Sequence, residues 1–205
     1  MLGASIDGAE RIGTLLCADG GTSPALSTLN ARVGDLAVAL CMFNQTAVSG
    51  SGGTWLTDGS GTCLRWRELT SGDLSAGVTL GRGGYIAIYR GPNALALVFS
   101  NTLTGGAQYK TVGGFARSSS HLGLIAATRS LGAGLDYEVD VTAPPVFDRW
   151  GAGSYYAGSA TPDNATRIAG FDRLQPLYDG ESFTYGKPVS GGGTRYLHIF
   201  ELRRV

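Results

Sequence analysis

Short apolar segments, bounded by glycine, serine, aspartate or proline, recur along this chain. Each is too short for a stable helix, and turn signals return about every 8–12 residues. This pattern predicts an all-β fold, an antiparallel β-sandwich of jelly-roll-like form in a single domain. The expected strands are residues 11–18, 34–40, 54–59, 64–69, 84–91, 95–99, 121–128, 135–141, 181–185 and 195–202.

The alternation of side chains within two of these segments predicts their surroundings. Residues 36–42 place large apolar side chains on one face and small apolar ones on the other. A strand that is apolar on both faces is expected to be central and covered on both sides. Residues 135–141 instead alternate apolar residues with Asp136, Glu138 and Asp140, which predicts one buried and one solvated face.

The organisation of the chain follows from where this pattern weakens. Residues 1–33 are mixed in composition and are expected to form either a first strand or an arm that reaches a partner. Residues 34–205 are expected to form the sandwich, with a long loop insertion around residues 142–180. No repeat of fixed period is present, which argues against propellers and solenoids.

The composition of the chain indicates which partners it does not bind and in which compartment it folds. Sixteen basic residues balance sixteen acidic ones, so we expect no binding to nucleic acid. No stretch approaches eighteen apolar residues, and no membrane insertion is expected. The first residues lack the features of a secretory signal. The cysteine content favours folding in a reducing compartment. Cys17, Cys41 and Cys63 lack metal-ligand spacing and are expected to be free, buried thiols, with a disulfide between two of them as the alternative.

Few residues are candidates for catalysis or metal binding. Both histidines, His121 and His198, fall within apolar strands, and no nucleophile elbow accompanies them. Asp136, Glu138 and Asp140 would be spaced about 7 Å apart along a strand, too far to surround one calcium ion. We therefore expect no catalytic residues, no metal, no cofactor and no enzymatic activity.

An aromatic group in the second half of the chain is the candidate contact site. Trp150, Tyr155 and Tyr156 lie near one another in sequence. Aromatic side chains in loops can stack on sugar rings or anchor a protein interface. The alternative, that these residues fill the interior of the sandwich together with Phe147, remains open from the sequence.

An ordered series of short segments runs along the chain: Gly34–Ala39, Thr54–Leu56, Leu64–Asp73 and Ile86–Gly91, followed by His121–Thr128, Ser154–Gly158 and Arg195–Leu202. This series resembles a β-sandwich domain found in many proteins of tailed bacteriophages. The resemblance lies in short strand and turn motifs, and one departure is Gly53-Thr54-Trp55, where the family usually has a proline before the tryptophan. Because these motifs mark strands and turns, no catalytic residue is carried over.

The resemblance implies a non-enzymatic structural or accessory protein of a phage particle, in the tail tip, a fibre or the head surface. Such a protein would fold in the bacterial cytoplasm, bind other virion proteins in the particle and form homo-oligomers. One alternative is a carbohydrate-binding module that contacts a host surface glycan through the aromatic group. Another is an enzyme acting on surface polysaccharide.

Overall fold

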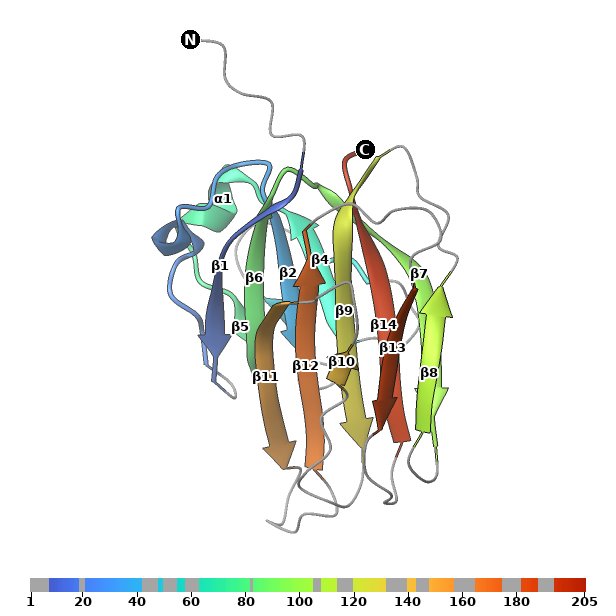
Figure 1. The fold of residues 1–205 in the computed structure, drawn as a ribbon. Coiled ribbons are helices and arrows are strands. Elements are labelled where there is room, and N and C mark those ends of the chain that lie inside the picture. Colours follow the sequence, from blue (N-terminus) through green and yellow to red (C-terminus); the bar gives the residue numbers. More distant parts are fainter. Residues whose placement is uncertain are drawn as a thin grey trace.

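Two antiparallel sheets of four and five strands face each other in this protein (Figure 1). This arrangement confirms the expected β-sandwich in a single domain. The computed structural model describes residues 8–18, 21–41, 48–49, 55–57, 63–81, 83–104, 108–113, 120–131, 140–142, 148–156, 165–174, 182–187 and 194–205.

The four-stranded sheet contains most of the early segments, in the order β1-β6-β2-β4. The expected segment at residues 54–59 contributes only a bridge, in which Leu56 pairs with Trp66. Residues 58 and 59 lie outside the described residues. The strands are β1 (Glu10–Cys17), β2 (Leu36–Cys41), β4 (Leu64–Glu68) and β6 (Gly84–Arg90).

The five-stranded sheet has the order β11-β12-β9-β14-β7. Long antiparallel pairs hold it together, and β14 pairs with β9 on one side and with β7 on the other. The strands are β7 (Ala94–Leu103), β9 (His121–Leu131), β11 (Asp148–Tyr156), β12 (Ala165–Arg173) and β14 (Thr194–Arg203).

Strands β11 and β12 correct the expectation of a long loop insertion around residues 142–180. They pair with each other, and β12 also pairs along its length with β9. The sequence of β12 did not suggest a strand because it includes Gly170, Asp172 and Arg173 among its apolar residues. Asp172 and Arg173 are nevertheless buried in the structure. Strand β1 likewise shows that residues 10–17 belong to the sandwich.

Shorter elements complete the described fold. Of the expected strand at residues 135–141, only the end falls within the described residues, in β10. No helix among the described residues is long and apolar enough to cross a membrane. The elements are β3 (Val48–Ser49), β5 (Thr79–Leu80), β8 (Gln108–Gly113), β10 (Asp140–Thr142), β13 (Ser182–Lys187), the 3-10 helix η1 (Leu26–Leu29) and the α-helix α1 (Ser71–Leu74).

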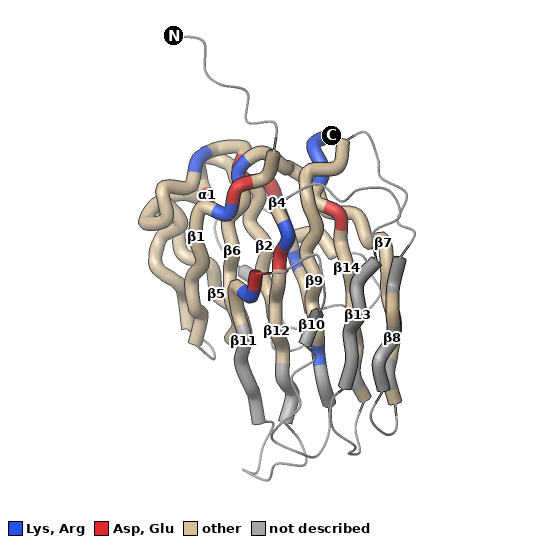
Figure 2. Tube along the Cα trace, in the orientation of Figure 1, with Lys and Arg blue, Asp and Glu red and all other residues tan. Residues whose placement is uncertain are grey.

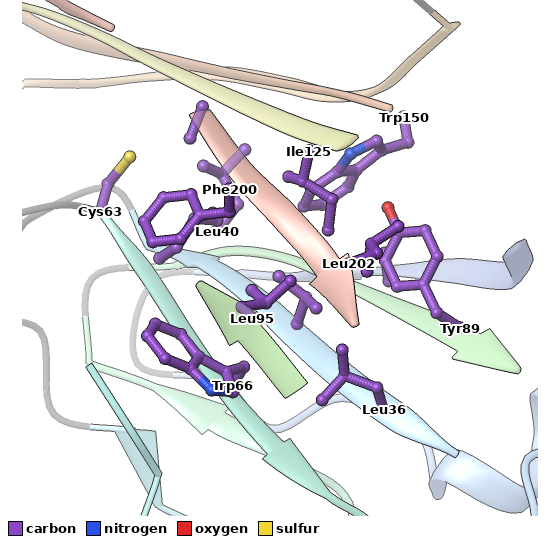
Figure 3. Close-up of a cluster of buried hydrophobic side chains, with 14 of the residues drawn as sticks. Leu36, Leu40, Cys63, Trp66, Tyr89, Leu95, Ile125, Trp150, Phe200 and Leu202 are labelled. Atoms are coloured by element: carbon purple, nitrogen blue, oxygen red, sulfur yellow. The ribbon is translucent and has the colours of Figure 1, made fainter. Parts of the chain in front are cut away.

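The main core fills the space between the two sheets. Leu40 from the first sheet and Phe200 from the second point toward each other in Figure 3, and Trp66 packs edge-on against the ring of Phe200 at 5.8 Å between centroids. The packing is tight at Gly170, where a Cβ atom would lie 2.6 Å from the indole ring of Trp150. Burying each large apolar side chain here stabilises the fold by about 1.5–3 kcal/mol.

A second cluster covers the outer face of the four-stranded sheet. Ala37, Ala39 and Cys41 of β2 pack there with Leu26 of η1 and Leu80 of β5. Every residue of β2 is buried, which confirms that this strand is central and covered on both sides. Cys17, Cys41 and Cys63 are free and buried, as expected.

Candidate functional site

Asp35 and Arg90, from two of the segments that resemble the phage domain, meet at one end of the sandwich. Asp35 precedes β2 and Arg90 ends β6, the neighbouring antiparallel strand. The Nε and Nη2 groups of Arg90 donate to Oδ1 and Oδ2 of Asp35 at 3.1 and 2.9 Å. Asp35 Oδ2 also accepts a hydrogen bond from the backbone of Arg32, and Arg90 donates to the carbonyl of Asn30. These bonds fix the loop before β2 against the end of β6.

Gly91 allows the chain to turn directly after this ion pair. Its φ angle is +106°, a backbone conformation that residues other than glycine rarely adopt. A Cβ atom here would lie 2.4 Å from the carbonyl oxygen of Gly8. The Gly91 carbonyl accepts a hydrogen bond from Nε of Arg204 at 2.8 Å. The turn therefore places the end of β6 beside the residue that follows β14.

Tyr89 connects the same end of β6 to the opposite sheet. Its hydroxyl donates to Oδ2 of Asp172 on β12 at 2.8 Å, and Arg11 of β1 donates to the same oxygen at 2.7 Å. Asp172 is only 1% exposed, and this burial raises the pKa of its carboxyl although both donors act to lower it. The carboxylate is satisfied within the fold and serves to tie the two sheets together.

The two histidines lie in the interior of the five-stranded sheet. His121 Nδ1 is 2.8 Å from Oε1 of Glu201, and both side chains are buried. The ring of His198 is buried and stacks against Tyr196. Both histidines therefore lie in strands, β9 and β14, as the sequence predicted. Arg203 ends β14 and forms an ion pair with Glu201.

An open hollow lies beside the Asp35–Arg90 pair, and we call it the arginine hollow. It measures about 400 Å³, within the range of roughly 300–1,000 Å³ that is typical of ligand pockets. Figure 2 shows charged residues gathered at this end of the sandwich, near the C-terminus. Its main lining residues are Arg32, Val33, Asp35, Glu68, Arg90 and Arg204.

The charges of the arginine hollow are only partly neutralised from within. Asp35 and Arg90 satisfy each other, whereas the exposed side chains of Arg32 and Glu68 have no hydrogen-bond or ion-pair partner among the described residues. The side chain of Arg204 makes one hydrogen bond among the described residues, from Nε to the carbonyl of Gly91. The guanidinium groups of Arg32 and Arg204 can therefore donate paired hydrogen bonds to an anionic group from outside.

A second hollow, of about 610 Å³, adjoins the first and shares Arg32 and Arg90 with it. Glu10 and Ser27 contribute to its lining. Glu10 brings a negative charge to this side, so the cationic surface is bounded there. Within the described ranges, no three metal-ligating side chains group together.

The three aromatic candidates lie on β11; the structure describes the side chain of Trp150 but only the backbone of Tyr155 and Tyr156. Trp150 is 6% exposed and belongs to the core between the sheets, as in the alternative that it fills the interior. This burial leaves its side chain little surface for contact with a partner. Tyr155 and Tyr156 end β11, where they pair with Thr166 and Ala165, and the structure describes only their backbone.

Sequence reasoning missed the arginine hollow because its lining comes from segments far apart in the chain. Arg32 lies in the loop before β2 and Glu68 ends β4, whereas Arg204 follows β14. Two sequence signals did fall on it: the Gly34-Asp35 and Tyr89-Arg90-Gly91 motifs. Their mutual pairing depends on the adjacency of β2 and β6, which neither motif shows by itself.

Comparisons of the chain with family models, with curated proteins and with solved structures found no match in any of the three. The established result is therefore a β-sandwich of two antiparallel sheets.

Proposed function

We propose that this protein is a non-enzymatic structural or accessory component of a tailed-phage particle, acting by assembly with other virion proteins. The observation that carries the proposal is the unit formed by Asp35, Arg90 and Gly91. Asp35 and Arg90 belong to two of the segments that resemble the phage family, and their side chains bond to each other at the end of the sandwich, directly before the turn at Gly91. Because these motif residues make contacts that hold the fold together, they favour a structural role over a catalytic one.

The described buried carboxylates also support a structural role. Asp35 and Asp73 are bound by arginines, Asp172 by an arginine and a tyrosine, and Glu201 by an arginine and a histidine. A general acid or base must reach a substrate, and these groups are instead held within the fold. They contribute to the rigidity that a repeated building block of a symmetric assembly requires.

Two measurements test this proposal. Mass spectrometry of purified phage particles should detect the protein, and light scattering coupled to size exclusion should give a mass above that of one chain. Its absence from particles would overturn the proposal. If the protein is a monomer in solution but is found in particles, the assembly role stands and only the predicted homo-oligomer is wrong.

A carbohydrate-binding module is the alternative function. Its original support is reduced because Trp150 is buried, which leaves Tyr155 and Tyr156 as the aromatic candidates. A glycan array would separate the two functions. Selective glycan binding that is lost in a Tyr155→Ala/Tyr156→Ala variant would favour the alternative, and no binding by the intact protein would remove it.

A further inference from the structure

The arginine hollow has the chemistry of a contact site for a partner. Three arginines and two acids line it, which leaves one net positive charge on a chain that is neutral as a whole. Arg90 and Asp35 neutralise each other, so the charge available to a ligand comes from Arg32 and Arg204. We propose that this hollow binds an acidic, extended segment of a neighbouring virion protein. This inference rests on the assembly function proposed above.

The lining favours a protein segment over a small anion. Val33 belongs to the hollow and is 63% exposed, so an occupant can gain apolar contact as well as charge pairing. A peptide segment can offer carboxylates and apolar side chains within a few residues of each other, whereas inorganic phosphate offers charge alone. Glu68, also on the lining, disfavours a ligand that is negative along its whole length.

The same lining argues against a sugar as the occupant. Sugar rings are commonly held by stacking on aromatic side chains, as well as by polar contacts. No aromatic side chain is among the described residues that line the arginine hollow. Tyr89 adjoins Arg90 in sequence, but its side chain is fully buried and bonded to Asp172.

The test uses the purified full chain and a fluorescein-labelled peptide of alternating glutamate and valine. Fluorescence anisotropy would give the dissociation constant for the intact protein and for Arg32→Gln, Arg204→Gln and the double variant. We expect each single change to weaken binding about threefold and the double change about tenfold, as for partly exposed ion pairs. Raising the salt concentration should weaken binding to the intact protein more than to the double variant.

Two further variants control this experiment. Arg149→Gln removes an exposed arginine of β11 that does not line the arginine hollow, and it should leave binding unchanged. Glu68→Gln removes the opposing carboxylate and should strengthen binding about threefold. The second variant changes affinity in the opposite direction, which general loss of folding cannot do.

Several results would overturn the proposal. These are equal binding by the intact protein and the double variant, equal weakening in Arg149→Gln, or equal binding of a control peptide with glutamine in place of glutamate. Displacement of the peptide by inorganic phosphate at a similar concentration would assign the hollow to small anions instead. Because particle content is measured separately, a protein found in particles that does not bind the peptide would refute only the assignment of the hollow.

Discussion

Asp35 and Arg90 lie 55 positions apart in the chain, yet two hydrogen bonds of 2.9 and 3.1 Å join their side chains. The pairing is possible because the start of β2 lies against the end of β6 in an antiparallel register. The Asp35 side chain is 5% exposed and that of Arg90 is 19% exposed, so water screens the pair only in part. The contact fixes one wall of the arginine hollow.

Replacing Arg90 by alanine should lower the free energy of unfolding by about 2–3 kcal/mol, because it leaves the buried carboxylate of Asp35 without its cation. Urea unfolding would measure the change. Arg32→Ala is the matched control, since that side chain is exposed and should contribute less than about 0.5 kcal/mol. Similar losses in the two variants would contradict the importance of the ion pair.

Replacing Tyr89 by phenylalanine should cost about 1–2 kcal/mol, because it removes a hydrogen bond to the buried carboxylate of Asp172 and preserves the ring. Thermal and urea unfolding would report the loss. Tyr196→Phe serves as the control, because it keeps the ring contacts with Arg129 and His198 and should be nearly neutral. A neutral Tyr89→Phe variant would show that the hydroxyl does not tie the sheets together.

Replacing Gly170 by alanine should destabilise the protein by about 1–3 kcal/mol, because the added methyl group would lie 2.6 Å from the Trp150 ring. Near-ultraviolet circular dichroism should also change as the indole moves. At Gly72 of α1 the nearest atom would be 3.9 Å away, so Gly72→Ala should be neutral or slightly stabilising. Unchanged stability in both variants would mean that the core around Trp150 has room.

Because cysteine thiols are buried, we expect the stability of the fold to decrease at alkaline pH. Burial raises the pKa of Cys17 to about 11, and burial together with the nearby Cys63 raises the pKa of Cys41 to about 12. An unfolded thiol titrates near about 8.5, so the folded state holds these protons more tightly. This contribution is complete below about pH 8.5 and is lost as the pH rises through the folded values.

We therefore expect the free energy of unfolding to fall above about pH 9, with a smaller slope in a Cys17→Ala variant than in the intact protein. Urea unfolding at a series of pH values would measure both slopes. At pH 8, a thiol reagent should label the native protein slowly and the unfolded protein rapidly. Rapid labelling of native Cys41 would refute its burial.

Strands were predicted correctly where their apolar residues follow one another within a few positions of the sequence. Residues 36–42 predicted a central strand, and β2 is buried throughout. Strand β12 was missed because Asp172 and Arg173 are usually signs of solvent exposure. Both are buried in the structure, and Asp172 is satisfied by partners on β1 and β6 that lie far away in the sequence.

By itself, the sequence determined the class of fold, since alternation and glycine-bounded turns act over a few residues. It also indicated that Cys17 and Cys41 would be buried, because their neighbours in the chain are largely apolar. Only the tertiary structure decided that Asp35 meets Arg90, that Trp150 enters the core and that Arg32 and Arg204 line one hollow. These contacts depend on sheet order and register, which bring together residues that no local pattern connects.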